Sequence, residues 1–141
     1  MQDSAILWPL IAQAALTAIV WVLLYVARLG EMRARHIDPQ RVKTSRLAAG
    51  VLENVAAADN FRNLFEVPVL FFAVGTLLAL THSAGPVEVA LAWGYVALRA
   101  LHSVVHVSYN RVVHRFFAYA ASTLVVFALW ARLAWRLAQA S

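Results

Sequence analysis

The feature that most constrains this chain is the apolar run from Ala5 to Ala27, which contains no charged residue. A helix that crosses the hydrocarbon core of a bilayer needs about 20 mostly apolar residues, and this run is long enough. Trp8 and Tyr25 lie near its two ends, where aromatic side chains favour the membrane interface. The run is too long for the apolar part of a cleaved signal peptide, so it predicts a spanning helix at about residues 5–28.

Three more apolar segments follow, and we expect helices at about residues 47–80, 87–109 and 116–137. Hydrophobic residues make up 62% of the chain and charged residues 13%, and its mean hydropathy is +0.69, a composition unlike that of ordinary soluble domains. With short connections, 141 residues hold roughly four spans and little else. We therefore predict one all-α integral membrane domain over residues 1–141, a bundle of four transmembrane helices.

Basic residues are concentrated between the first two expected helices. By the positive-inside rule this connection faces the cytoplasm, which places the N- and C-termini outside; in a bacterium the membrane is the inner, cytoplasmic one. Arg132 and Arg136, near the outer end of the last helix, go against the rule but are outnumbered. The net charge of +5 therefore sets topology, and we expect no nucleic-acid partner. The basic residues of the connection are Arg28, Arg33, Arg35, Arg41, Lys43 and Arg46.

A polar stripe runs along the second expected helix. Asp59, Arg62, Asn63 and Glu66 recur at spacings of three and four residues and so share one face. Pro68 follows, and we expect it to loosen the backbone just beyond them. Ionisable residues at such a depth are costly, and they are usually paired, turned to the interior or functional.

A second polar stripe lies on the cytoplasmic half of the third expected helix, where Arg99, His102, Ser103 and His106 again recur at spacings of three and four. Two histidines one turn apart can ligate a metal ion, but the pattern offers no third ligand, so we predict no metal site. The chain contains no cysteine, which excludes disulfides and a cysteine nucleophile.

The region of the two stripes carries more positive than negative charge, which predicts a cationic pocket that binds an anion. The alternative is an ion pair between Arg62 and Glu66 that only fixes helix register and the geometry of an oligomer. The four arginines that outnumber Asp59 and Glu66 are Arg62, Arg99, Arg111 and Arg115.

These residues resemble a known family, the membrane-associated proteins in eicosanoid and glutathione metabolism (MAPEG), which includes microsomal glutathione transferases, a leukotriene synthase and microsomal prostaglandin E synthase. The similar segments are "GEMRAR" at 30–35, "RNLFE" at 62–66, and "RALHSVVH" with "NRVVHRFFAY" within 99–119. Their spacing is nearly constant and covers most of the chain. The resemblance implies a homotrimer of four-helix protomers in membrane lipid, with glutathione as cosubstrate at each subunit interface near the cytoplasmic face.

The resemblance also implies how glutathione is held. Glutathione carries two carboxylates, an ammonium group and a thiol, so its site needs several cations and one acid. Arg33, Arg62 and Arg99 are expected to bind the carboxylates. Asn63 is expected to bind the backbone amide groups, and Glu66 the ammonium group.

At the thiol end, the resemblance implies that Arg115, or Arg111 as second choice, is the catalytic residue. Positive charge beside the thiol lowers its pKa and so stabilises the reactive thiolate. His102, His106 and Tyr119 complete the expected binding set.

We therefore expect a membrane-bound glutathione-dependent transferase or peroxidase that acts in detoxification on lipophilic electrophiles or lipid hydroperoxides. Two departures from the family's pattern argue against carrying over eicosanoid synthesis: His106 stands where a tyrosine is usual, and Phe116 stands where prostaglandin E synthase has a serine. The alternative is a non-catalytic membrane protein that binds an anionic ligand or a lipid head group, with the polar stripes serving trimer assembly.

Overall fold

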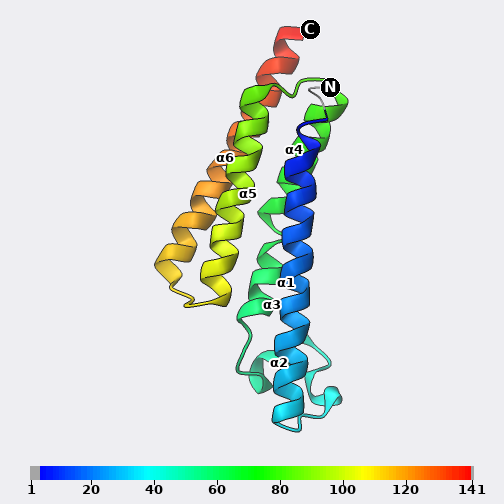
Figure 1. Ribbon diagram of the computed structural model, residues 1–141, viewed down its shortest axis with the longest axis vertical. Coiled ribbons are helices and arrows are strands. Elements are labelled where there is room, and N and C mark those ends of the chain that lie inside the picture. The colour runs from blue at the N-terminus through cyan, green and yellow to red at the C-terminus, as the bar shows by residue number, and fades with distance from the viewer. Residues whose placement is uncertain (1–3, 141) are drawn as a thin grey trace.

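The computed structural model describes residues 4–140, and all of its elements are helical. The long helices run side by side along one axis, and the described part of the chain begins and ends at the same end of the bundle (Figure 1). Residues 1–3 and 141 of the predicted domain lie outside the described part. In chain order the helices are α1 (Leu7–Ala34), the 3-10 helix η1 (Pro39–Val42), α2 (Ser45–Val51), α3 (Ala56–Asn63), α4 (Val67–Leu80), α5 (Pro86–Val107) and α6 (Val112–Ala140).

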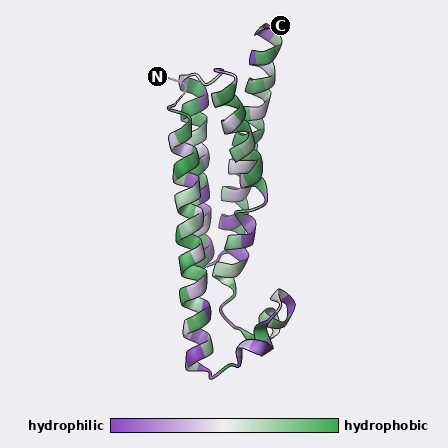
Figure 2. Cartoon of the chain, turned by 90° about the vertical axis from the view of Figure 1, so that its right-hand side faces the viewer, coloured by the Kyte–Doolittle hydropathy of each residue, from purple (hydrophilic) through white to green (hydrophobic). Residues whose placement is uncertain are grey.

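Three segments are long and apolar enough to cross a membrane: α1, α3 with α4 as Ala56–Leu80, and α6 over Val112–Gln139. Hydrophobic residues cover most of the long helices, and hydrophilic residues are frequent at the end that carries α2 (Figure 2). These segments support the predicted integral membrane protein. The remaining long helix, α5, is less apolar because it carries Glu88, Arg99 and two histidines, so its membrane crossing stays a prediction.

The continuous helix expected at 47–80 is instead three helices, α2, α3 and α4. The backbone leaves the helical conformation at Leu52 and again at Glu66, whose φ and ψ are −92° and −102°. Pro68 lies in the first turn of α4, where its missing N–H costs no hydrogen bond. Inside a continuous helix the same ring would clash with the carbonyl of Leu64 and leave it unpaired, so the proline breaks the helix just after the first polar stripe.

Helix α1 continues to Ala34, beyond its expected end at 28. The carboxylate of Glu31 accepts hydrogen bonds from the backbone amides of Glu53 (2.7 Å) and Asn54 (3.0 Å) and pairs with Arg35 at 2.6 Å. The last turns of α1 are thereby tied to the connection between α2 and α3. The bounds of α5 and α6 differ from those expected by only a few residues.

The apolar core joins α1, α4, α5 and α6. Phe71 of α4 stacks on Tyr95 of α5 with ring centres 4.1 Å apart. Gly75 lets α1 approach α4 closely, since a Cβ there would lie 2.7 Å from Cδ1 of Leu10. Helices α5 and α6 form an antiparallel pair along this core, which carries the second polar stripe up against α3 (Figure 1).

A buried ion cluster, which the sequence analysis missed, joins α5 to α6 near the chain ends. The carboxylate of Glu88 is fully buried and contacts Nε of Arg132 at 2.8 Å and Nε of Arg136 at 3.7 Å. Its second oxygen accepts the backbone N–H of Gly85 at 3.0 Å and so caps α5. The two arginines that go against the charge rule are therefore partners of a buried acid.

Replacing Glu88 by alanine should lower the free energy of unfolding by about 2 kcal/mol, because it leaves two arginines without their acid and removes the cap. This value is below that of a wholly buried pair since 38% of the Arg132 side chain is exposed. Thermal unfolding in detergent, followed by circular dichroism, measures the change. The control is Glu53→Ala, which removes an exposed partner of Arg35 and should change stability by less than about 0.5 kcal/mol. Equal effects would contradict the assignment of Glu88 as a structural clamp.

Candidate functional site

The centre of the candidate site is Arg99 on α5, whose side chain is completely buried. Its Nε donates a hydrogen bond to the hydroxyl of Tyr95 at 3.1 Å, and its guanidinium carbon lies 4.8 Å from the centre of the Tyr119 ring. Both terminal nitrogens, Nη1 and Nη2, have no hydrogen-bond partner among the described residues. Arg99 is thus held by two tyrosines, while its terminal N–H groups stay available to an anion.

Tyr119 of α6 connects Arg99 to the first polar stripe. Its hydroxyl donates a hydrogen bond to Oε2 of Glu66 at 3.3 Å. Glu66 lies in the break between α3 and α4, and its side chain is exposed. One aromatic ring therefore has a buried cation against its face and an exposed carboxylate at its hydroxyl.

Two buried histidines lie one turn apart on α5. The rings of His102 and His106 meet edge to face at 5.5 Å, and Nδ1 of His102 lies 3.1 Å from the backbone carbonyl oxygen of Arg115. Since a carbonyl only accepts hydrogen bonds, Nδ1 of His102 carries a proton. Neither Nε2 of His102 nor either ring nitrogen of His106 has a partner in residues 4–140. Within the same residues, no group of three His, Asp or Glu side chains is arranged to hold a metal ion.

Asn60 belongs to this cluster, and the sequence analysis missed it. It is fully buried on α3, its Oδ1 accepts a hydrogen bond from the hydroxyl of Ser103 at 3.2 Å, and its Nδ2 has no partner among the described residues. Its position between Ala57 and Leu64, both buried, follows a helical spacing of three and four. That spacing was a usable signal for an inward-facing amide.

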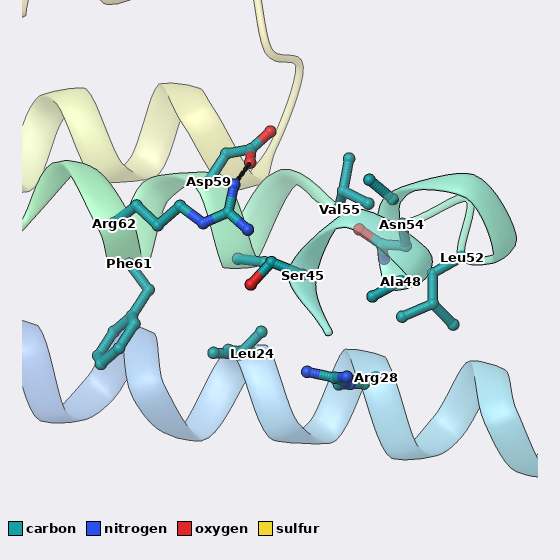
Figure 3. Close-up of a pocket in the computed structure, with 12 residues that line it drawn as sticks. Leu24, Arg28, Ser45, Ala48, Leu52, Asn54, Val55, Asp59, Phe61 and Arg62 are labelled. Atoms are coloured by element: carbon teal, nitrogen blue, oxygen red, sulfur yellow. Dashed lines mark ion pairs between the residues drawn. The ribbon is translucent and has the colours of Figure 1, made fainter. Parts of the chain in front are cut away.

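Arg62 faces away from this cluster. It pairs with Asp59 at 3.6 Å, and both line a cleft between α1, α2 and α3 (Figure 3). The described residues contain no ion pair between Arg62 and Glu66, so that alternative is wrong for the protomer. Asn63, at the end of α3, is half-buried and makes no side-chain hydrogen bond with described residues.

Three other expected residues lie at the edge of the site or outside it. The side chains of Arg33, in the last turn of α1, and Arg111, in the connection to α6, are exposed and form no hydrogen bond or ion pair with described residues. Arg115 donates from Nη1 to Oδ1 of Asn110 at 2.6 Å, while its backbone carbonyl contacts His102. One protomer thus brings together Glu66, Arg99, His102, His106 and Tyr119, with Arg115 beside them.

The order of these residues along four long helical segments agrees with a comparison to known families. Residues 6–135 match the profile of the MAPEG family. This chain belongs to the MAPEG family. It is therefore a membrane protein of a group associated broadly with eicosanoid and glutathione metabolism. No curated protein and no solved structure matches it significantly.

In this MAPEG protein, the electrostatics of the site favour a ligand with an acidic group. A guanidinium that is buried without a counter-ion is costly, and a carboxylate that accepts both terminal N–H groups removes much of that cost. Nearby, Glu66 can accept hydrogen bonds from a cation, and Nε2 of His102 can accept a hydrogen bond from an N–H, O–H or S–H group. The arrangement suits a ligand that carries a carboxylate, an ammonium group and a further hydrogen-bond donor.

Proposed function

We propose that this MAPEG protein is a membrane-bound glutathione-dependent enzyme that acts on lipophilic electrophiles or lipid hydroperoxides. The observation that carries the proposal is the buried Arg99, whose two terminal nitrogens have no partner among the described residues, with Tyr119 against it and Glu66 at the hydroxyl of Tyr119. A cation and an acid so arranged suit the glutamyl residue of glutathione, whose α-carboxylate and ammonium group are attached to the same carbon.

The remaining groups of glutathione require more residues than one protomer places at the site. Asn63, at the end of α3, is proposed to contact the backbone amide groups of glutathione, and Arg62 of the same helix is proposed to bind one of its carboxylates. The exposed Arg33 and Arg111 are available to a ligand held between neighbouring protomers. We therefore also propose a homotrimer in which adjacent protomers complete each site.

Arg115 is proposed to stabilise the thiolate of glutathione, since it lies at the start of α6 beside His102. A positive charge next to the sulfur lowers the pKa of the thiol and raises the fraction of thiolate. In conjugation, the thiolate attacks an electrophilic carbon of the substrate, a carbon–sulfur bond forms and the leaving group departs. In peroxide reduction, two glutathione molecules become one disulfide, and the hydroperoxide becomes an alcohol and water.

The orientation in the membrane follows the charge distribution. The end of the bundle that carries α2 holds the basic connection, and the start of α1 and the end of α6 lie at the opposite end (Figure 1). We propose that the α2 end faces the cytoplasm, which places the glutathione site towards the compartment that supplies glutathione. The lipophilic second substrate would enter from the bilayer.

Isothermal titration of glutathione into the detergent-purified protein tests this function. We expect saturable binding that weakens by about tenfold or more in Glu66→Gln, because the variant loses a charged partner of the ammonium group. The control is Glu53→Gln, which neutralises an exposed carboxylate that pairs with Arg35 and is not part of the cluster, and it should leave the affinity unchanged. If the folded protein does not bind glutathione, the proposal fails, and the alternative of a non-catalytic protein with an anionic ligand is favoured.

A further inference from the structure

A cleft of about 350 Å³ lies between α1, α2 and α3, and none of its lining residues comes from α5 or α6 (Figure 3). Leu24 and Arg28 of α1 form one wall, and Asp59 and Arg62 of α3 form the facing wall. The polar cluster around Arg99 lines no part of this cleft. The cleft therefore shares only Arg62 with the residues proposed to bind glutathione.

The charged groups of the cleft suit a single negative charge. Arg28 uses Nη2 to donate a hydrogen bond to the backbone carbonyl of Val42 at 2.8 Å, and the other N–H groups of its guanidinium make no hydrogen bond with described residues. Arg62 is paired with Asp59 at 3.6 Å. Two arginines and one aspartate leave one excess positive charge, and the hydroxyl of Ser45 adds a hydrogen-bond donor on the α2 side (Figure 3).

A second cavity, of about 270 Å³, opens along the same boundary between α1 and α3–α4. Ala14 and Thr17 of α1 line it together with Phe65, Val69 and Phe72. Its walls are apolar except for Thr17, whose hydroxyl is already bonded to the backbone carbonyl of Gln13 at 3.0 Å. This cavity therefore offers room for hydrocarbon and no charged partner.

The two cavities are stacked along the axis of α1. Thr17 of the apolar cavity and Leu24 of the charged cleft are seven residues apart, which is about 10 Å along a helix. Trp21 lies between them and forms an exposed edge-to-face pair with Tyr25, which is level with the charged cleft; the ring centres are 5.0 Å apart. Such aromatic pairs favour the depth of the membrane interface, so the cleft lies at head-group depth and the apolar cavity lies at acyl-chain depth.

We propose that the boundary between α1 and α3–α4 binds a membrane lipid with a singly charged phosphodiester head group. The phosphate contacts Arg28 and Arg62 in the cleft, and an acyl chain lies in the cavity beside Ala14 and Phe65. The charge of the head group matches the excess charge of the cleft. The order of charged and apolar walls along α1 matches the order of head and chain in a leaflet.

The test is isothermal titration of dioctanoyl phosphatidylglycerol into the full chain in a neutral detergent. We expect saturable binding that weakens by about tenfold or more in Arg28→Gln. Arg46→Gln is the control, because it removes an exposed positive charge near the cleft that does not line it; its affinity should stay within about twofold of wild type. Ala14→Phe, which fills the apolar cavity, should also weaken binding.

Three further outcomes would overturn the proposal. Equal binding of dioctanoyl phosphatidylcholine would show that the head-group charge is not recognised. Inorganic phosphate that binds as tightly as the lipid would show a site for the free ion. Equal losses in Arg28→Gln and Arg46→Gln would show general attraction to a basic surface. Each of these tests is made without glutathione, so its result is independent of the proposed enzyme activity.

Discussion

Replacing Arg99 by methionine is expected to abolish glutathione binding without lowering the stability of the ligand-free protein. Methionine keeps the length and apolar stem of the side chain and removes a buried charge whose two terminal nitrogens have no partner among the described residues. Exchanging a buried ionic group for a well-packed apolar one is often neutral or stabilising by about 1–4 kcal/mol. The loss of the hydrogen bond to Tyr95 offsets about 1 kcal/mol of this gain.

Thermal unfolding with and without glutathione measures both parts of this prediction. The wild-type melting temperature should rise with glutathione, and that rise should be absent in Arg99→Met, since only a ligand bound to the folded state stabilises it. The matched control is Arg132→Met, because Arg132 is paired with the buried Glu88. That variant should lose stability and keep glutathione binding. If Arg99→Met instead unfolds the protein and Arg132→Met does not, Arg99 has a structural role.

Replacing Arg115 by alanine is expected to lower turnover with glutathione by about 100-fold or more, as is usual when a charged group that stabilises a reacting anion is removed. The fold should survive, because the hydrogen bond between His102 and residue 115 uses the backbone carbonyl, which alanine retains. The lost side-chain contact is the hydrogen bond to the exposed Asn110. Steady-state rates with chlorodinitrobenzene and with cumene hydroperoxide measure the effect on conjugation and on peroxide reduction.

Arg111→Ala is the comparison for this experiment. The Arg111 side chain is exposed and makes no ion pair or hydrogen bond with described residues, but it is available to a ligand between protomers, so we expect its removal to lower turnover much less than the removal of Arg115. A large loss of turnover in Arg111→Ala with a small loss in Arg115→Ala would assign the stabilisation of the thiolate to Arg111. Loss of the oligomer in Arg115→Ala, measured by light scattering in detergent, would instead favour the structural alternative.

Part of the site followed from spacing alone. Arg99, His102 and His106 share one face of a helix at any rotation of that helix, so their proximity is a property of the sequence. The same reasoning extends to Tyr95, which lies one turn before Arg99 and bonds to it, although the prediction did not include it. Asp59 and Arg62 also pair within one turn, whereas the alternative to an anion pocket had paired Arg62 with Glu66.

The rest of the site depended on how the helices face one another. Ser103 and Asn60 are 43 positions apart, and Glu88 and Arg132 are 44 apart, so no local pattern relates them. The break at Glu66 depends on Pro68. A proline in a helical pattern can either begin a new helix or kink a continuous one, and the pattern alone does not decide between them. The sequence also did not decide which arginines lie at the polar cluster. Within the protomer, Arg33 lies outside it.

By itself, the sequence determined that this protein has long apolar helices suited to a membrane and that it belongs to the MAPEG family. Both depend on composition and spacing, which are properties of the chain whatever its packing. The tertiary structure decided which polar side chains are buried together, that Arg62 turns to a second cleft and that Glu88 pairs with two arginines. The reason is that burial depends on the rotation and contact of whole helices, and residues far apart in the sequence determine both.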